Sequence, residues 1–215
     1  MPGFQLHLIT DSSAAEDLPR AVSQALEGGV DWIQVREKRL PARSLFELAR
    51  MVGERCRARG AGLLVNDRID VALAAGAHGV HLGGKSLPVA VARQILPRPR
   101  LLGVSVHSLA EARAAERAGA DYVTMGSVFP TRSHPGLSGV GLEELRRVVE
   151  GVEIPVLAIG GITAANIGEV LATGVAGVAV ISAILMAPSP RLAAAELRRA
   201  MDEAPGRPRR PFPRP

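Results

Sequence analysis

The sequence predicts one α/β domain, a single (β/α)8 TIM barrel over residues 1–204, from three observations. Eight short apolar runs alternate with eight segments of helical periodicity, which indicates parallel strands joined by helices. Helical segments end in glycine before the next run, as in EGGVDW and ARGAGLL, and glycine readily takes the left-handed conformation that ends a helix. The runs are apolar throughout rather than alternating, as in a sheet that is covered on both faces.

The expected elements alternate strictly along the chain. Strands are expected at residues 5–10, 32–37, 62–67, 79–83, 101–106, 122–127, 155–160 and 177–182. Helices are expected at residues 17–28, 42–59, 68–75, 87–96, 108–118, 141–150, 163–173 and 189–203. Ser108, with Glu111 three residues later, and Thr163 are the expected caps of two of these helices. An open doubly wound sheet is the alternative, but eight near-equal units in 215 residues favour closure.

Composition indicates a cytoplasmic protein with no membrane partner. No apolar run is long enough to cross a bilayer, and we expect no signal peptide because the chain enters a strand-like run at once. The one cysteine, Cys56, excludes an internal disulfide and fits a reducing compartment.

Most of the net charge of +5 lies in residues 205–215, which carry four arginines and no acidic residue. The rest of the chain is therefore close to neutral, and aromatic residues make up 3% of the sequence, so we expect no nucleic-acid partner. The segment 205–215 is rich in proline, and we expect a disordered basic tail. A homodimer stays open, because closed dimers are the commonest assemblies.

Two segments near the end of the barrel suit an anion. IGGIT at 159–163 follows the seventh strand, and ISAI at 181–184 ends the eighth, where barrels often hold phosphate. Glycines let the backbone approach a ligand, and amides that begin a helix favour an anion. We expect phosphate to bind at Gly160, Gly161, Ile181 and Ser182; the simpler alternative is that the glycines only form a tight turn.

Further polar residues stand at the ends of other strands, where the active sites of such barrels lie. They are Gln34, Arg36, Lys38, Asn66, Asp67, Ser105, His107 and Ser127. Arg36 and Lys38 could bind a second anion, such as a pyrophosphate or a carboxylate. The long segment 128–139 carries Thr131, Ser133 and His134; such loops are uncommon unless functional, and we expect a mobile lid.

Seven segments together resemble a known superfamily. They are LITD (8–11), QVREK (34–38), LLVNDRIDVALAAGAHGVHLG (63–83), GVSVHS (103–108), GADYVTMGSVFPT (119–131), IPVLAIGGIT (154–163) and GVAVISAI (177–184). In this order they resemble the thiamine phosphate synthase and thiazole tautomerase superfamily. The resemblance implies that Gly161, Ile181 and Ser182 hold a thiazole phosphate. Gln34, Arg36, Lys38 and Asn66 would hold the other end of the ligand, with Ser105, Thr131 and Ser133 as further contacts.

The superfamily has two main branches. Synthases couple a pyrimidine pyrophosphate to the thiazole phosphate and use Mg²⁺, for which Asp67 would be the first ligand. Ser86 stands where the synthase pattern has a second acid, and His134 stands where its lid has a lysine. One carboxylate beside Lys85 would hold Mg²⁺ only weakly. These departures favour the tautomerase branch, whose members isomerise a thiazole carboxylate phosphate and need no cofactor.

The tautomerase pattern is also incomplete, because Ser127 replaces the histidine that transfers the proton. Serine needs an activating base, whereas histidine carries protons readily near neutral pH. His134 and His107 are the remaining candidates, and His81 is expected to serve in core packing. The main expectation is a tautomerase-like enzyme that binds a small phosphorylated thiazole. A synthase that tolerates Ser86 and a non-catalytic, thiazole-phosphate-binding regulator are the alternatives.

Overall fold

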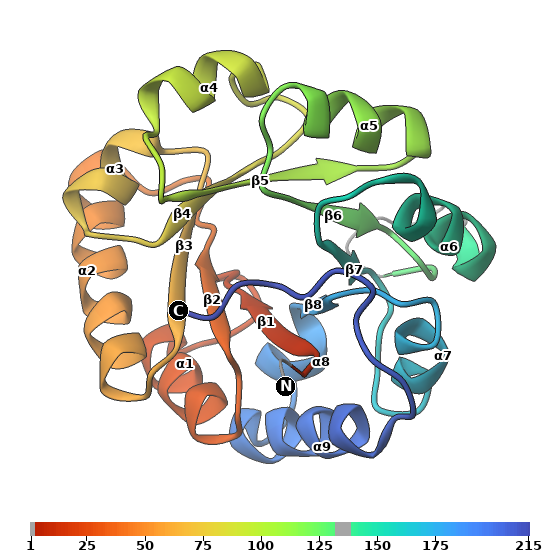
Figure 1. Cartoon of the computed structure of the whole chain (residues 1–215). Helices are drawn as coiled ribbons and strands as arrows, with labels where there is room; N and C mark the ends of the chain where they lie inside the picture. The colour runs from red at the N-terminus through yellow and green to blue at the C-terminus, as the bar shows by residue number, and fades with distance from the viewer. Residues whose placement is uncertain (1–2, 132–138) are drawn as a thin grey trace.

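The computed structural model describes residues 3–131 and 139–215, and it confirms the predicted barrel. Eight parallel strands close in sequence order, so that β1 pairs with both β2 and β8. The helices form a ring outside the strands (Figure 1). In the described part of the chain, no helix is long and apolar enough to cross a membrane.

The elements follow the predicted alternation. The strands are β1 (Gln5–Ile9), β2 (Trp32–Val35), β3 (Gly62–Asn66), β4 (Gly79–Leu82), β5 (Leu101–Val106), β6 (Tyr122–Gly126), β7 (Val156–Ile159) and β8 (Gly177–Val180). The helices are α1 (Leu18–Glu27), α2 (Ala42–Ala58), α3 (Ile69–Ala74), α4 (Val89–Ile95), α5 (Leu109–Arg117), α6 (Gly141–Gly151), α7 (Ile167–Leu171), α8 (Ser182–Leu185) and α9 (Pro190–Glu203).

Three local expectations have different outcomes. The Ser108 cap is confirmed, because its hydroxyl accepts a hydrogen bond from the Glu111 amide at 3.2 Å. The Thr163 cap is wrong: the Thr163 amide donates to the Asn166 side chain at 2.8 Å, and α7 starts only at Ile167. The eighth strand also ends before Ser182, which instead begins the short helix α8. The first change lengthens the loop after β7, and the second places the start of a short helix at the expected phosphate site.

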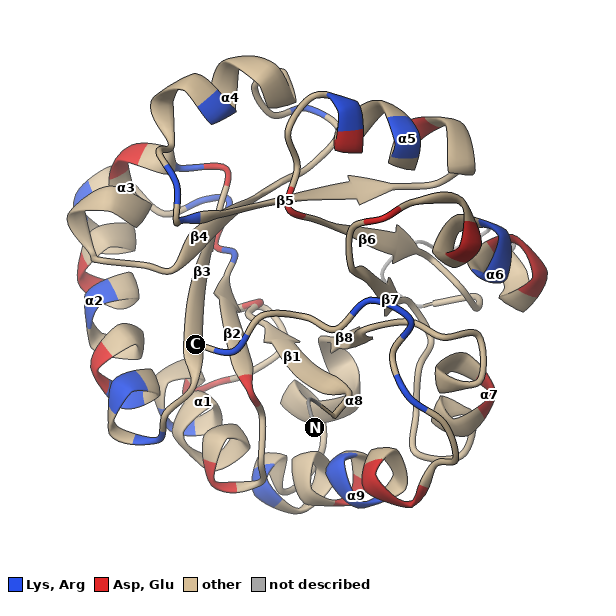
Figure 2. Ribbon diagram, in the orientation of Figure 1, with Lys and Arg blue, Asp and Glu red and all other residues tan. Residues whose placement is uncertain are grey.

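The outer helices carry charges of both signs. Acidic and basic residues are interspersed along α2, α6 and α9 (Figure 2). Several pairs lie one turn apart, such as Arg147 with Glu144 at 3.3 Å on α6 and Arg198 with Asp202 at 2.8 Å on α9. Exposed pairs of this kind contribute little to stability, and they leave these helices without a face of one charge sign.

The C-terminal segment packs against the barrel, which corrects the expectation of a disordered tail. It crosses the N-terminal end of the strands as a dark blue trace (Figure 1). The Arg209 amide donates to the Gly174 carbonyl at 2.9 Å, and Arg210 forms an ion pair with Glu153. Proline does exclude helix and central strand here, but it also restricts the conformations of the unfolded chain. Because less conformational entropy is lost on folding, a few contacts are enough to order an extended segment.

Phe212 supplies the apolar part of that contact. Its side chain is 2% exposed and lies inside the barrel, at the N-terminal end of the strands. Its ring centroid lies 4.7 Å from that of His7, 5.2 Å from Trp32 and 4.8 Å from Tyr122, in edge-on arrangements. Edge-on contacts of aromatic rings are favourable beyond the area that they bury. The tail therefore closes one end of the barrel, and the other end stays open.

Candidate active site

A cavity of about 860 Å³ opens at the C-terminal end of the barrel, and every strand or the loop after it contributes to the lining. The predicted site residues that line it are Gln34, Arg36, Lys38, Asn66, Asp67, Ser105, His107, Ser127, Thr131, Gly160, Gly161, Ile181 and Ser182. Ser133 and His134, also predicted, lie outside the described residues. The structure thus brings together every predicted site residue that it describes.

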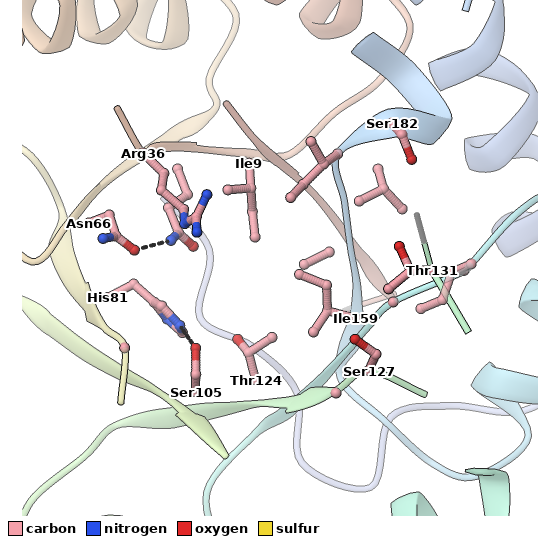
Figure 3. A pocket seen from close by; sticks show the side chains of 18 of the residues that line it. Ile9, Arg36, Asn66, His81, Ser105, Thr124, Ser127, Thr131, Ile159 and Ser182 are labelled. Atoms are coloured by element: carbon pink, nitrogen blue, oxygen red, sulfur yellow. Dashed lines mark hydrogen bonds between the residues drawn. The ribbon is translucent and has the colours of Figure 1, made fainter. Parts of the chain in front are cut away.

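Polar groups occupy two sides of this cavity. Arg36, Asn66, His81 and Ser105 lie on one side, and Ser182, Thr131 and Ser127 lie on the other (Figure 3). Ile9 and Ile159 lie between the two groups (Figure 3). An elongated ligand with polar ends and an apolar middle would fit this arrangement.

Amide side chains link β2 to β3 on the first side. Gln34 is 4% exposed, and its Nε2 donates to Oδ1 of Asn66 at 3.1 Å. Asn66 Nδ2 in turn donates to Asp67 at 2.8 Å. Asp67 has a φ of 61°, a left-handed conformation in which Asp and Asn are enriched among residues other than glycine. This backbone conformation and the Asn66 contact together orient the Asp67 carboxylate.

Thr10 and Glu37 brace the backbone that carries Arg36. The Thr10 hydroxyl donates to Glu37 at 2.7 Å and accepts from the Arg36 amide at 2.9 Å. Glu37 is 8% exposed and also accepts from the Ser12 amide at 3.1 Å. Sequence reasoning did not assign this role, although an acid between Arg36 and Lys38 was a signal for it. The buried carboxylate is satisfied by the loop, and Arg36 is left to face the cavity.

Arg36, Lys38 and Lys85 form a cationic group at the cavity. Among the described residues, none of the three forms an ion pair with a carboxylate, although all line the cavity. From the sequence alone, Lys85 is expected only to weaken metal binding at Asp67. Unpaired cations that converge on a cavity favour an anionic ligand.

Asp67 and Ser86 form a small set of oxygen ligands next to these cations. The Ser86 hydroxyl donates to the Asp67 carboxylate and accepts from the Gly83 amide at 2.7 Å. Mg²⁺ prefers oxygen ligands and is often held by one or two carboxylates together with substrate phosphates and waters. In the described ranges no group of three or more His, Cys, Asp or Glu could hold a metal. The residues present fit Mg²⁺ that is shared with a phosphorylated ligand.

The loop after β7 forms the opposite side. Gly160 and Gly161 have φ values of 104° and 67°, which disfavour any side chain. A Cβ atom on Gly160 would lie 2.6 Å from Cα of Ser127, and one on Gly161 would lie 2.8 Å from the carbonyl oxygen of Pro130. The Asn166 side chain donates to the Gly161 carbonyl at 3.0 Å, which holds this carbonyl turned towards α7.

The short helix α8 follows β8, the strand that pairs with β7, so it lies beside this glycine loop. Ser182 and Ala183 form its first turn and line the cavity. Amides in the first turn of a helix have no acceptor within the helix, so they can donate to an anion. The glycine loop and α8 together form a cradle of the size of one phosphate group, and the phosphate expected there stays a prediction.

His107 and Ser127 line the cavity without forming a nucleophile and its base. His107 Nδ1 bonds to the Gly126 carbonyl oxygen, and its amide donates to Glu111 at 2.7 Å. Within the described ranges, no histidine or carboxylate is hydrogen-bonded to the Ser127 hydroxyl. The described part of the site therefore gives Ser127 no activating base.

His81 was expected in core packing, and it also reaches the cavity. It is 3% exposed, and its Nε2 lies 2.9 Å from the Ser105 hydroxyl (Figure 3). Burial lowers the pKa of His81 to about 4, against an opposing effect of Asp67, and Arg36 adds to the lowering. The imidazole is therefore neutral near pH 7. The alternation of side chains along β4 could have indicated this inward position.

Known proteins resemble this chain over most of its length. The family described as thiamine monophosphate synthase matches residues 6–184. This chain belongs to that family. The thiamine-phosphate synthase of Pyrococcus furiosus is 46% identical over 203 residues, which cover 94% of this chain and 97% of that protein. The thiamine-phosphate synthase of Moorella thermoacetica is 44% identical over 210 residues, covering 96% and 100%.

A solved structure gives the same result. The thiamine phosphate pyrophosphorylase from Pyrococcus furiosus superimposes with a TM-score of 0.87 at 46% identity, and the match covers 94% of this chain and 98% of that one. Membership of the thiamine monophosphate synthase family is thereby established, as is a place in thiamine biosynthesis. The preference for the tautomerase branch is not supported, since these relatives are named as synthases.

Proposed function

We propose that this protein is a thiamine-phosphate synthase, which joins a pyrimidine pyrophosphate to a thiazole phosphate and releases pyrophosphate. The observation that carries the proposal is the pair of anion-binding regions in one cavity. Arg36, Lys38 and Lys85 follow β2 and β4, the cradle at residues 160–161 and 182–183 follows β7 and β8, and all of them line the cavity. Two phosphorylated substrates need two such regions. The naming of the relatives as synthases supports the same reaction.

The cavity residues would divide the work of a displacement at the pyrimidine methylene carbon. The cradle binds the thiazole phosphate and so presents the thiazole nitrogen towards the centre of the cavity. The three cations bind the pyrophosphate and stabilise the negative charge that builds up on it as its bond to carbon breaks. The apolar middle at Ile9 and Ile159 would hold the two rings and exclude water. Placing both reactants together supplies much of the rate.

Mg²⁺ bound at Asp67 would add Lewis-acid stabilisation of the leaving pyrophosphate. Asp67 supplies the one carboxylate, and Asn66 orients it. Lys85 would neutralise part of the negative charge of the pyrophosphate. A metal held by a second acid would otherwise do so. Ser86 contributes a neutral oxygen at the same point.

The deciding experiment is to incubate the purified protein with each set of substrates. We expect thiamine phosphate and pyrophosphate from pyrimidine pyrophosphate, thiazole phosphate and Mg²⁺, separated by liquid chromatography. A parallel reaction contains the thiazole carboxylate phosphate alone. Isomerisation there without any coupling would establish the tautomerase instead, and tight binding of thiazole phosphate with neither product would establish the regulator.

A substitution at Ser86 tests the metal-binding part of the proposal. Ser86→Asp is expected to tighten Mg²⁺ binding in the presence of pyrophosphate by roughly tenfold, because a second carboxylate beside Asp67 adds charge to the ligand set. Isothermal titration calorimetry measures the change. Ser86→Asn is the matched control, with similar size and no charge, and should not tighten binding. Equal affinities for the aspartate and asparagine variants would contradict a metal at this point.

A further inference from the structure

A line of three side chains runs from the interior of the barrel to the floor of the cavity. Tyr122 on β6 is 1% exposed, and its hydroxyl lies 3.1 Å from Nδ1 of His81 on β4. Nε2 of His81 lies 2.9 Å from the hydroxyl of Ser105 on β5 (Figure 3). Ser105 lines the cavity, whereas Tyr122 does not. Tyr122 can therefore act on a ligand only through the other two residues.

The buried groups determine which atom carries each proton. A neutral imidazole has one nitrogen that donates and one that accepts. Among the described residues, the Tyr122 hydroxyl has no hydrogen-bond partner other than His81, and its ring packs against Phe212. If Nδ1 donated to Tyr122, the phenol proton would be buried without an acceptor, which is costly. Tyr122 therefore donates to Nδ1, and the imidazole proton is on Nε2.

The same reasoning then fixes the direction of the next hydrogen bond. The Nε2 proton of His81 must donate to Ser105 Oγ, since both groups lie at hydrogen-bond distance. The Ser105 hydroxyl proton cannot point back at His81. Within the described residues it has no other acceptor, so it points into the cavity.

We propose that Tyr122 and His81 are positioning residues that make Ser105 a hydrogen-bond donor to the substrate. The matching group on a ligand is an unprotonated acceptor, such as a ring nitrogen of a heteroaromatic substrate. This assignment rests on the proposed synthase function: the group is a ring nitrogen of the pyrimidine, because Ser105 lies on the same side of the cavity as Arg36 (Figure 3). Selection of an acceptor at this point distinguishes the pyrimidine from analogues with a ring N–H or C–H there.

The first test observes the tautomer directly. The protein is labelled with ¹⁵N in its histidines, and two-bond ¹H–¹⁵N correlation spectra are recorded for the wild type and for His81→Gln, which assigns the signals. We expect His81 to be neutral with its proton on Nε2. His78 is an internal reference, because its Nδ1 accepts from the Leu63 amide at 3.0 Å, so its proton is also on Nε2. A His81 proton on Nδ1 would overturn the proposal.

The second test removes the Tyr122 hydroxyl. Tyr122→Phe should weaken the Nε2–H preference in the spectra and raise KM for the pyrimidine pyrophosphate by about three- to tenfold, the usual effect of one misdirected hydrogen bond. KM for thiazole phosphate should not change. Phe212→Leu is the matched control, because it loosens packing against the same ring but leaves the hydroxyl in place. Unchanged pyrimidine KM in Tyr122→Phe, or an equal rise in Phe212→Leu, would refute a positioning role.

The two tests separate this proposal from the proposed function. The spectra need no substrate and report on His81 even if the protein couples nothing. If coupling is absent, the synthase proposal fails, and binding of the pyrimidine pyrophosphate measured by calorimetry replaces KM. An Nε2–H tautomer with no loss of that affinity in Tyr122→Phe would still refute the role assigned to Ser105.

Discussion

Asp67→Asn is expected to slow the formation of thiamine phosphate by roughly 10²–10³-fold. A metal ion that polarises phosphate oxygens is worth several kcal/mol in the transition state, and each 1.36 kcal/mol is a factor of about ten in rate. Asparagine has nearly the same shape and tolerates the φ of 61° at this position. The loss would therefore reflect charge rather than a changed backbone. Steady-state assays at several Mg²⁺ concentrations measure it.

A nearby carboxylate provides the control for this result. Asp70 lies three residues along and pairs with Arg68 at 2.5 Å, away from the cavity lining. Asp70→Asn should leave the rate nearly unchanged. Affinity for thiazole phosphate should be the same in both variants, since its cradle lies on the opposite side of the cavity. A rate for Asp67→Asn within a factor of about three of the wild type at saturating Mg²⁺ would show that no metal acts at Asp67.

The sequence predicted the barrel because its signals are local. Apolar runs, helical periodicity and glycines such as Gly28 and Gly119 between helix and strand each depend on a few neighbouring residues. In a closed parallel barrel all strand ends meet at one rim. Residues as distant as Asn66 and Ser182 could therefore be assigned to one site from the order of the strands alone.

The remaining features depend on contacts between distant segments. Sequence reasoning treated Ser86 as a lost ligand, whereas the structure turns its hydroxyl onto Asp67, 19 positions away. It assigned His81 to packing, since the partners Tyr122 and Ser105 belong to other strands. The choice of reaction depended on the departures at Ser86, His134 and Ser127. Single substitutions say little about a reaction when the rest of the site is retained.

The tail was misjudged for a similar reason. Composition alone describes residues 205–215 as polar and rich in proline, which is typical of disorder. Composition cannot show that His7, Trp32 and Tyr122 leave space for a ring at the N-terminal end of the strands. Phe212 packs in this space. One aromatic residue at the right distance from the last helix is enough to order such a segment when the space already exists.

Phe212→Ala is therefore expected to lower the free energy of unfolding by about 3–5 kcal/mol, the usual cost of removing a buried phenylalanine ring. The side chain is 2% exposed and contacts three other rings. That loss is a large share of the roughly 5–15 kcal/mol that stabilises a typical domain. Urea unfolding, followed by the fluorescence of Trp32, the one tryptophan, measures it directly. The midpoint should fall with little change in the slope.

Two comparisons make the result specific to the tail. Phe46→Ala removes the same ring from α2, where it is only partly buried, and should cost less, about 1–2 kcal/mol. A chain that ends at residue 204 should lose at least as much stability as Phe212→Ala, because it lacks the ring and the Arg209 and Arg210 contacts as well. If the tail is detached in solution, the free energy of unfolding of both tail variants will lie within about 0.5 kcal/mol of that of the full chain. The inference that the tail closes the N-terminal end of the barrel would then be wrong.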